Sequence, residues 1–195
     1  MAQANKVSIT NSSDGQRMIV DGKEIMLNGM NWDYIPRGQT IATTAYQFWN
    51  EPDDIIKDAL DAEMALWKNM GVNVIRQYVG VPPKWVQYIY ENYGIYTMIN
   101  HSFGRYGLTI DGAWEPNTDY ADPRVREILK KEVTQMAMDF KDTPGILLFM
   151  LGNENNYGLF WDGAETEDIP IEDRRSTQRA RPMYKLFNEG SQWIK

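Results

Sequence analysis

The chain has 195 residues, a net charge of −7, 43% hydrophobic residues and no cysteine. This length is enough for one domain with a sizeable core. The acidic balance argues against a nucleic-acid partner, the lack of cysteine excludes thiolate sites and disulfides, and no apolar run approaches the roughly 18 residues of a membrane span.

The first residues carry a short export-like pattern. Ala2-Gln3-Ala4, directly after Met1, resembles the small-residue end of a signal peptide. We therefore expect a secreted or periplasmic protein, with a cytoplasmic one as the alternative.

Residues 1–27 are predicted to form an N-terminal extension that contains a β-hairpin. Met18–Val20 and Ile25–Leu27 flank Asp21-Gly22, a dipeptide suited to a tight turn because glycine accepts a positive φ. The second arm continues toward Asn31 as the first strand of the next region.

Residues 28–195 alternate between short apolar strands and amphipathic helices. After the strand that ends at Asn31, the predicted strands are Val72–Arg76, Ile95–Asn100 and Ile146–Leu151. The predicted helices are Asp53–Met70, Pro82–Tyr93, Asp122–Phe140 and Pro182–Ile194. Strands and helices that alternate at this spacing predict parallel strands joined by right-handed crossovers.

This order predicts an α/β fold of the (β/α) TIM-barrel type. Residues 1–195 would form a single domain, the first four βα units of a barrel (a half barrel) preceded by the N-terminal β-hairpin. Near-continuous apolar strands indicate a sheet covered on both faces or a barrel wall. A flavodoxin-like doubly wound sheet is the rival, disfavoured because no glycine-rich phosphate loop follows the first strand.

Polar residues stand at the end of each predicted parallel strand. The four strand ends are Asn31-Trp32, Arg76, Asn100-His101 and Asn153-Glu154. Polar side chains are costly to bury without partners, and in a barrel the carboxyl ends of the strands meet at the rim where active sites lie. The pattern therefore predicts a functional site at this rim.

Glu154 is the main catalytic candidate. It follows an apolar strand, where desolvation would favour the protonated carboxyl group that a general acid needs. The alternative is that Glu154 caps the following loop or pairs with a base such as Arg76. The residues alone leave both interpretations open.

A family resemblance extends over Met18–Lys195. Leu151-Gly152-Asn153-Glu154 resembles the Asn-Glu signature of the retaining (β/α)8-barrel glycoside hydrolase clan, and Asn73-Val74-Ile75-Arg76 resembles that clan's second strand with its arginine. Lys23–Asn31 is most similar to the barrel entry of glycoside hydrolase family 2. Val72–Pro82 is also similar to the fungal β-1,3-glucanosyltransferases.

The resemblance implies hydrolysis or transfer of a β-linked oligo- or polysaccharide by a retaining double displacement. Glu154 would be the acid/base, Asn153 would hydrogen-bond the sugar 2-hydroxyl, and Arg76 would orient a second carboxylate. His101 would either contact a sugar hydroxyl or be a hydrogen-bonded loop histidine. Further substrate-binding candidates are Asn31, Trp32, Trp114, Tyr157 and Trp161. No metal or other cofactor is expected.

One element of the clan has no counterpart in the predicted strands. The clan's nucleophile comes from the seventh strand, and Glu189, inside a predicted helix, is a poor substitute. We therefore expect a truncated fragment, a missing barrel half or self-association, and an inactive isolated chain. A non-catalytic carbohydrate-binding segment is the main alternative. A metal-dependent hydrolase is disfavoured by the single histidine.

Overall fold

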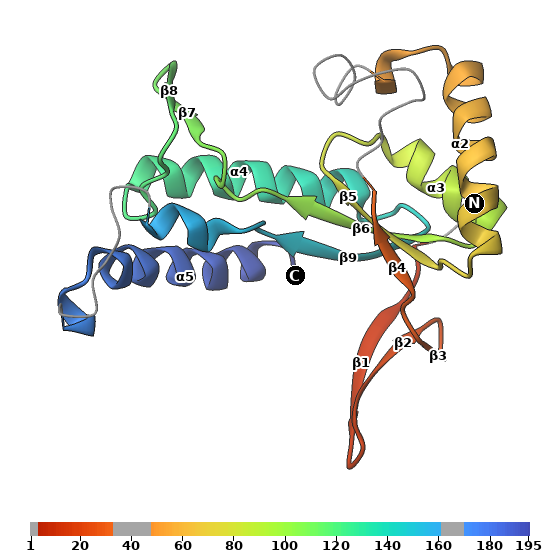
Figure 1. Cartoon of the computed structure of the whole chain (residues 1–195), viewed down its shortest axis with the longest axis horizontal. Helices are drawn as coiled ribbons and strands as arrows, with labels where there is room; N and C mark the ends of the chain where they lie inside the picture. The colour runs from red at the N-terminus through yellow and green to blue at the C-terminus, as the bar shows by residue number, and fades with distance from the viewer. Residues whose placement is uncertain (1–3, 33–47, 161–169) are drawn as a thin grey trace. The chain divides into compact units, whose positions relative to one another are not determined.

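The computed structural model of the chain describes residues 4–32, 48–160 and 170–195. Residues 2 and 3 of the export-like pattern and Trp161 lie outside the described residues. The strands are β1 (Val7–Ser12), β2 (Gly15–Val20), β3 (Lys23–Ile25), β4 (Gly29–Asn31), β5 (Val74–Tyr78), β6 (Tyr96–His101), β7 (Leu108–Ile110), β8 (Ala113–Glu115) and β9 (Ile146–Leu151) (Figure 1). The α-helices are α2 (Asp53–Asn69), α3 (Pro83–Tyr93), α4 (Pro123–Phe140) and α5 (Arg175–Trp193), and the 3-10 helices are η1 (Phe48–Asn50), η2 (Asn155–Phe160) and η3 (Ile171–Asp173).

The main sheet has the strand order β4-β5-β6-β9. Strands β4 and β5 are parallel, with Asn31 opposite Arg76. The N–H of Thr97 donates to Gly145 near the start of β6 and β9, and the N–H of Gly152 donates to His101 at their ends, each over 2.8 Å. Strands β6 and β9 therefore run in the same direction, which confirms the predicted α/β fold with a parallel sheet.

The chain packs as two compact units. The first contains Met1–Ile99 and Asp139–Phe149, and the second contains Asn100–Met138 and Met150–Lys195. Strands β6 and β9 each contribute residues to both units.

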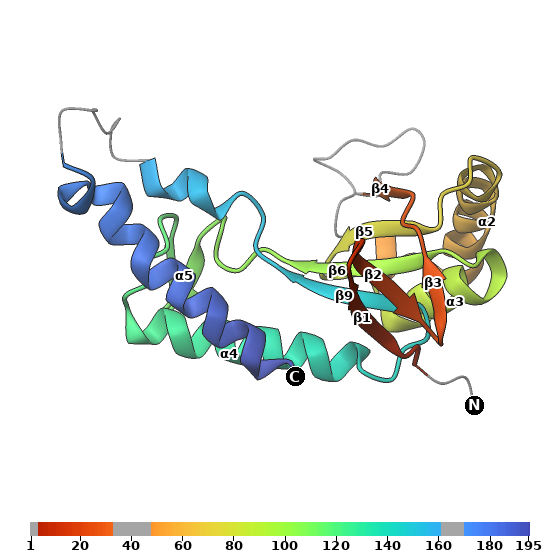
Figure 2. The same ribbon diagram turned by 90° about the horizontal axis from the view of Figure 1, so that it is seen from below.

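In the first unit, β1, β2 and β3 form an antiparallel sheet that packs on the parallel strands. Strands β2 and β3 pair on either side of Asp21-Gly22, and β1 is a further strand that the sequence analysis did not predict. Val20 of this sheet is buried with Val74 and Leu147, and Figure 2 shows the small sheet beside β6 and β9. Burying a side chain of this size contributes about 1.5–3 kcal/mol.

Helices α2 and α3 complete the first unit. Ile56, Leu60 and Met64 form one fully buried face of α2, as their helical spacing predicts. Helix α3 begins at Pro83 and ends before Gly94, whose φ of 69° suits the left-handed cap of a helix. Both helices match their predicted bounds closely, whereas β5 begins and ends two residues later than predicted.

In the second unit, α4 and α5 lie side by side (Figures 1 and 2). Arg126 of α4 forms a salt bridge with Glu189 of α5 over 2.7 Å. The predicted start of the last helix was wrong, because α5 begins at Arg175 and contains Pro182. Proline usually marks a first helical turn, and the polar residues before Pro182 lack the apolar stripe that would have indicated an earlier start.

The segment between β6 and α4 contains an antiparallel hairpin of β7 and β8, two strands that are not among those predicted from the sequence. Its turn is Asp111-Gly112, and Asp111 has a φ of 52°. An Asp-Gly pair between short alternating segments is a recognised hairpin signal.

Candidate active site

Gly152 redirects the chain at the end of β9. Its φ is 90°, and a Cβ at this position would lie 2.6 Å from Cζ of Phe187 in α5 and 2.7 Å from Oδ1 of Asn155. Only glycine therefore fits without displacing a neighbour. The resulting turn places Asn153 and Glu154 directly beyond the strand.

Glu154 has a φ of 54°, which is uncommon for a residue other than glycine. Phe103, which follows β6, has a φ of 53°. Backbone conformations of this kind cluster at functional sites, where the surrounding structure holds them in place. Glu154 is also exposed, in contrast to the predicted desolvation, because the turn at Gly152 carries it away from the apolar strand.

The side chain of Asn155 holds this turn. Oδ1 of Asn155 accepts the N–H of Asn153 over 2.7 Å. Nδ2 of Asn155 donates to the Tyr120 hydroxyl over 2.8 Å and to the Phe103 carbonyl over 3.0 Å. Asn155 is buried, so these bonds satisfy an amide that would otherwise be costly to bury.

Two exposed tyrosines and an arginine accompany Glu154 in the second unit. Nδ2 of Asn153 donates to the Tyr106 hydroxyl over 3.0 Å, and the N–H of Tyr157 donates to the Glu154 carbonyl over 2.9 Å. The Arg105 guanidinium lies 5.3 Å from the ring centre of Tyr106 and 5.6 Å from that of Tyr157. We call Arg105, Tyr106, Asn153, Glu154 and Tyr157 the Glu154 patch.

The Glu154 patch contains three residues predicted from the sequence and two that the sequence analysis missed. Asn153, Glu154 and Tyr157 were predicted. Arg105 and Tyr106 lie in the segment between β6 and α4, and their spacing in the sequence carries no signal for a site. Tyr106 and Tyr157 are 53% and 52% exposed, so both rings offer an apolar surface to a ligand.

His101 is placed differently from the Glu154 patch. It is buried, its Nδ1 accepts the N–H of Phe103 over 3.1 Å, and its Nε2 lies 3.4 Å from the Glu132 carboxylate. Both ring nitrogens therefore face protein groups. This geometry favours the hydrogen-bonded loop histidine over the sugar contact, which stays a prediction.

Trp114 is the remaining aromatic candidate in the second unit. It belongs to β8 and is 60% exposed. A Cβ on Gly107 would lie 2.7 Å from Cζ2 of Trp114, so part of the indole lies over that glycine. Its exposed surface is available for stacking.

In the first unit, Asn31 and Arg76 lie on neighbouring parallel strands. They face each other in the register, and Nη1 of Arg76 donates to Oδ1 of Asn31 over 3.4 Å. The Arg76 guanidinium also lies 5.3 Å from the ring centre of Tyr78. Asn31 and Arg76, two of the predicted rim residues of this unit, are therefore adjacent, whereas a single rim shared by Arg76, His101 and Glu154 stays a prediction.

Trp32, predicted to stack on sugar, is a core residue in this structure. Only 4% of it is exposed, and its ring packs edge-on against Trp49 and Trp67 with centres 6.3 and 6.4 Å away. Aromatic pairs in this edge-on arrangement contribute about 0.5–1.5 kcal/mol beyond the area that they bury. Burial raises the pKa of the neighbouring Glu63, and a hydrogen bond from Trp32 partly offsets the rise.

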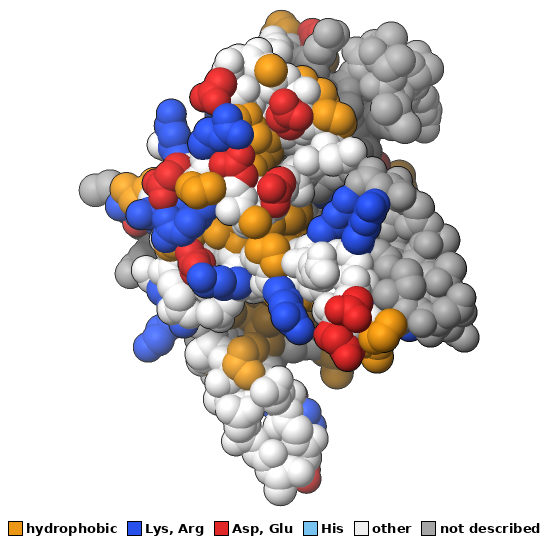
Figure 3. Space-filling view, turned by 90° about the vertical axis from the view of Figure 1, so that its left-hand side faces the viewer, with side chains coloured by type: hydrophobic (Ala, Val, Ile, Leu, Met, Phe, Trp, Pro, Cys, Tyr) orange, Lys and Arg blue, Asp and Glu red, His pale blue; other side chains and the backbone are white. Residues whose placement is uncertain are grey.

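Within the described residues, no group of three or more His, Cys, Asp or Glu is placed to hold a metal ion. None of the helices described is long and apolar enough to cross a membrane. On the described part of the face in Figure 3, lysine and arginine side chains are interspersed with aspartate and glutamate.

The chain is similar to several known proteins in sequence and in fold. No protein-family model matches the chain. Two curated relatives are β-galactosidases: one from Lactococcus lactis subsp. lactis, 23% identical over 141 residues, and one from Photobacterium profundum, 25% identical over 147 residues. The matches cover 71% and 74% of this chain. The chain is therefore similar in sequence to these β-galactosidases at low identity.

Solved structures of glycoside hydrolases share the fold. Bacteroides uniformis β-glucuronidase 2 matches over 98% of this chain with a TM-score of 0.62 and 14% identity. Parabacteroides merdae β-glucuronidase matches over 97% with a TM-score of 0.54 and 18% identity, and Amycolatopsis orientalis exo-chitosanase over 94% with a TM-score of 0.51 and 21% identity. The predicted resemblance to glycoside hydrolases is confirmed.

The chain corresponds to only a part of each glycoside hydrolase. Its matches span 12% of both β-galactosidases and 18–19% of the three solved structures. The activities of these whole proteins therefore enter below as proposals.

Proposed function

We propose that this chain forms the part of a retaining β-glycosidase active site that carries the acid/base carboxylate, Glu154. The observation that carries the proposal is the strained turn after β9, where Asn155 and Tyr120 fix Asn153 and Glu154 beyond a strand of the parallel sheet. Glu154 would protonate the leaving oxygen and then activate water. Its exposure lets a substrate reach the carboxylate directly.

The names of the relatives support this chemistry. Both curated relatives are β-galactosidases, and one structural relative is a β-glucuronidase covalently bound to cyclophellitol-6-carboxylate aziridine. A covalent bond to the enzyme is what a double displacement requires. We infer that this chain takes part in hydrolysis or transfer of a β-linked glycoside by the same type of mechanism.

The other site residues receive binding roles in this proposal. Asn153 would contact the sugar 2-hydroxyl, Tyr157 and Trp114 would stack on sugar rings, and Arg76 would orient the second carboxylate. Asn31, which accepts a hydrogen bond from Arg76, keeps its predicted substrate-binding role. His101 would support the loop after β6 through Phe103 and Glu132. Trp161 keeps its predicted substrate contact as a proposal outside the described residues.

A retaining enzyme also needs a nucleophile about 5–5.5 Å from the acid/base. Glu189 forms a salt bridge with Arg126, and Glu132 faces His101, so neither is presented to a sugar at Glu154. We propose that the nucleophile belongs to barrel strands outside these 195 residues, and that the 195-residue chain has no turnover by itself. Self-association or a separate partner would be other ways to complete the barrel.

The proposal is tested by measuring how the rate of the Glu154→Ala variant depends on the leaving group of the substrate. The measurement uses the barrel completed with its remaining strands. Glu154→Ala should slow a natural oligosaccharide by about 10²–10⁴-fold, because its leaving group needs protonation. With an activated aryl β-glycoside, glycosylation of the enzyme should lose far less rate, because its leaving group departs without protonation. The matched control is Glu172→Ala, which removes an exposed carboxylate in η3 and should leave both rates unchanged.

Equal losses on both substrates would reject the acid/base role. A carbohydrate-binding segment without catalysis is the alternative, and the exposed rings of Tyr106 and Tyr157 would suit it. If that alternative holds, Glu154→Ala should leave sugar binding intact. No completed barrel should then show turnover.

A further inference from the structure

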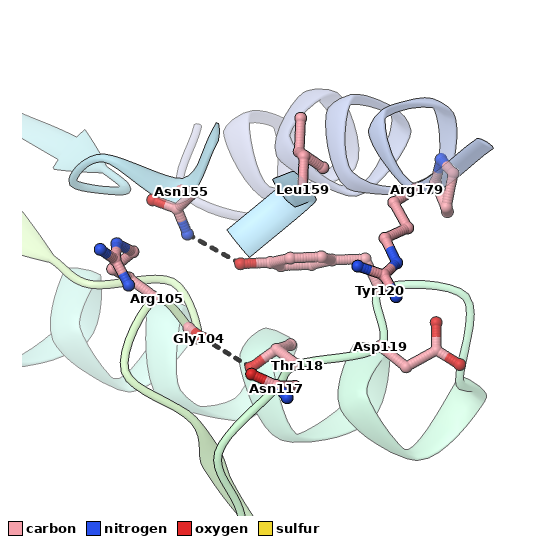
Figure 4. Close-up of a pocket in the computed structure, with 10 residues that line it drawn as sticks. Gly104, Arg105, Asn117, Thr118, Asp119, Tyr120, Asn155, Leu159 and Arg179 are labelled. Atoms are coloured by element: carbon pink, nitrogen blue, oxygen red, sulfur yellow. Dashed lines mark hydrogen bonds between the residues drawn. The ribbon is translucent and has the colours of Figure 1, made fainter. Parts of the chain in front are cut away.

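We propose that a pocket beside the Glu154 patch is a subsite for an anionic sugar residue, one that carries a carboxylate or a sulfate ester. The inference rests on the proposed function, because it assigns a substrate class to the same site. The pocket encloses about 310 Å³ between the segment after β6, η2 and the first turns of α5, all within the second unit (Figure 4). That volume lies at the lower end of the range of small-ligand sites, about 300–1,000 Å³.

The charges lining the pocket favour an anion. Arg105 and Arg179 contribute two guanidinium groups, and Asp119 contributes one carboxylate. Oδ1 of Asp119 already accepts the N–H of Ala121 over 2.9 Å, so part of its charge is engaged locally. Among the described residues that line the pocket, two guanidinium groups therefore accompany one carboxylate, and guanidinium groups bind carboxylates and sulfates through paired hydrogen bonds.

The remaining walls favour a sugar over a bare anion. The Tyr120 ring lies across the pocket in Figure 4, and its hydroxyl is held by the amide of Asn155 and the carbonyl of Phe103. A ring fixed in this way offers a rigid apolar face, while the exposed Asn117 supplies an amide group for hydroxyls.

Two residues connect the pocket to the Glu154 patch. Asn155 lines the pocket and also accepts the N–H of Asn153. Arg105 lines the pocket and lies over the rings of Tyr106 and Tyr157. A saccharide bound across the Glu154 patch would therefore place a neighbouring residue in the pocket, where an acidic group would meet Arg105 and Arg179.

The test is a titration of the 195-residue chain followed by NMR chemical shifts. The probes are D-glucuronate, glucose 6-sulfate, D-glucose and sodium sulfate, and the first two separate a carboxylate source from a sulfate source. At least one sugar acid should bind about tenfold or more tightly than D-glucose, since its charge-assisted bonds have no counterpart in the neutral sugar. Equal affinity for all three sugars, or sulfate binding as tightly as the sugar acids, would overturn the proposal.

Variants locate the binding site. Arg179→Gln should weaken sugar-acid binding about tenfold or more and leave D-glucose unchanged. Arg181→Gln, an exposed change on the same helix outside the pocket lining, should have no effect. Asn117→Ala, also exposed, should weaken binding without touching the core, which keeps the test valid if Arg179→Gln unfolds.

Sugar-acid binding that neither Arg179→Gln nor Asn117→Ala reduces would overturn the pocket assignment. Because binding is read without turnover, this inference and the proposed function fail separately. If the chain binds sugar acids but Glu154→Ala slows both substrates equally, the subsite proposal stands. The acid/base role of Glu154 is then rejected.

Discussion

Asn153 donates its side-chain amide to the hydroxyl of Tyr106, 3.0 Å away and 47 residues earlier in the chain. This bond links the turn that carries Glu154 to the segment after β6. It also orients the side-chain amide of Asn153 within that turn.

Tyr106→Phe should therefore loosen Asn153 while leaving the fold nearly unchanged. In the completed barrel, we expect kcat/KM to fall about tenfold for a substrate with a 2-hydroxyl and much less for its 2-deoxy analogue. Tyr184→Phe, an exposed tyrosine change in α5, is the control. Equal losses on the two substrates would show that Tyr106 does not act through Asn153.

Gly152→Ala should destabilise the chain by about 2–4 kcal/mol, because it adds a strained positive φ to an overpacked contact with Phe187. Gly112→Ala is a matched control: its φ is 83°, but a Cβ there meets nothing within 4 Å. It should cost only about 1 kcal/mol from backbone strain. Urea unfolding of both variants measures the difference, and equal losses would contradict the close contact at Gly152.

Asp61→Ala should destabilise the chain by about 1–3 kcal/mol. Asp61 in α2 accepts the hydroxyls of Tyr88 and Tyr93 from α3, and Nζ of Lys57 lies 2.7 Å away. The substitution leaves both hydroxyls without this acceptor. Asp58→Ala, an exposed aspartate change on the same helix, should alter the unfolding free energy by less than about 0.5 kcal/mol.

The same aspartate should make part of the stability sensitive to acid. The Lys57, Tyr88 and Tyr93 hydrogen bonds lower the pKa of Asp61 from 3.8 to about 2. A lowered folded-state pKa contributes stability that is present above the unfolded pKa and is lost as the pH falls toward the folded value. The Tm difference between wild type and Asp61→Ala should therefore shrink between about pH 4 and pH 2. A constant difference across this range would reject the assignment.

The sequence predicted the features of the fold that depend on local patterns. Strand β9 follows from a run of apolar residues, and α4 follows from Asp122-Pro123 and its apolar stripe, so both elements match closely. The start of α5 was missed because the polar turns before Pro182 have no periodicity. Strand β1 alternates apolar with polar residues on a mostly exposed surface, a pattern with little weight on its own.

The sequence predicted best those site residues that directly follow a strand and carry a polar side chain. Asn153 and Glu154 directly follow a strand, and that position is visible in the sequence. Tyr106 reaches Asn153 across 47 residues, a contact that no spacing rule anticipates. Trp32 was assigned to the rim because it follows a strand, but two distant tryptophans bury it.

The role of Glu154 is tested most directly by the product that Glu154→Ala forms with azide in the completed barrel. If Glu154 is the acid/base, an activated aryl β-glycoside still glycosylates the nucleophile, and azide then displaces the enzyme in a second inversion. NMR of the product should show a β-glycosyl azide, the configuration of the substrate. An α-glycosyl azide would contradict the account, because a single inversion by azide would mean that Glu154 is the nucleophile.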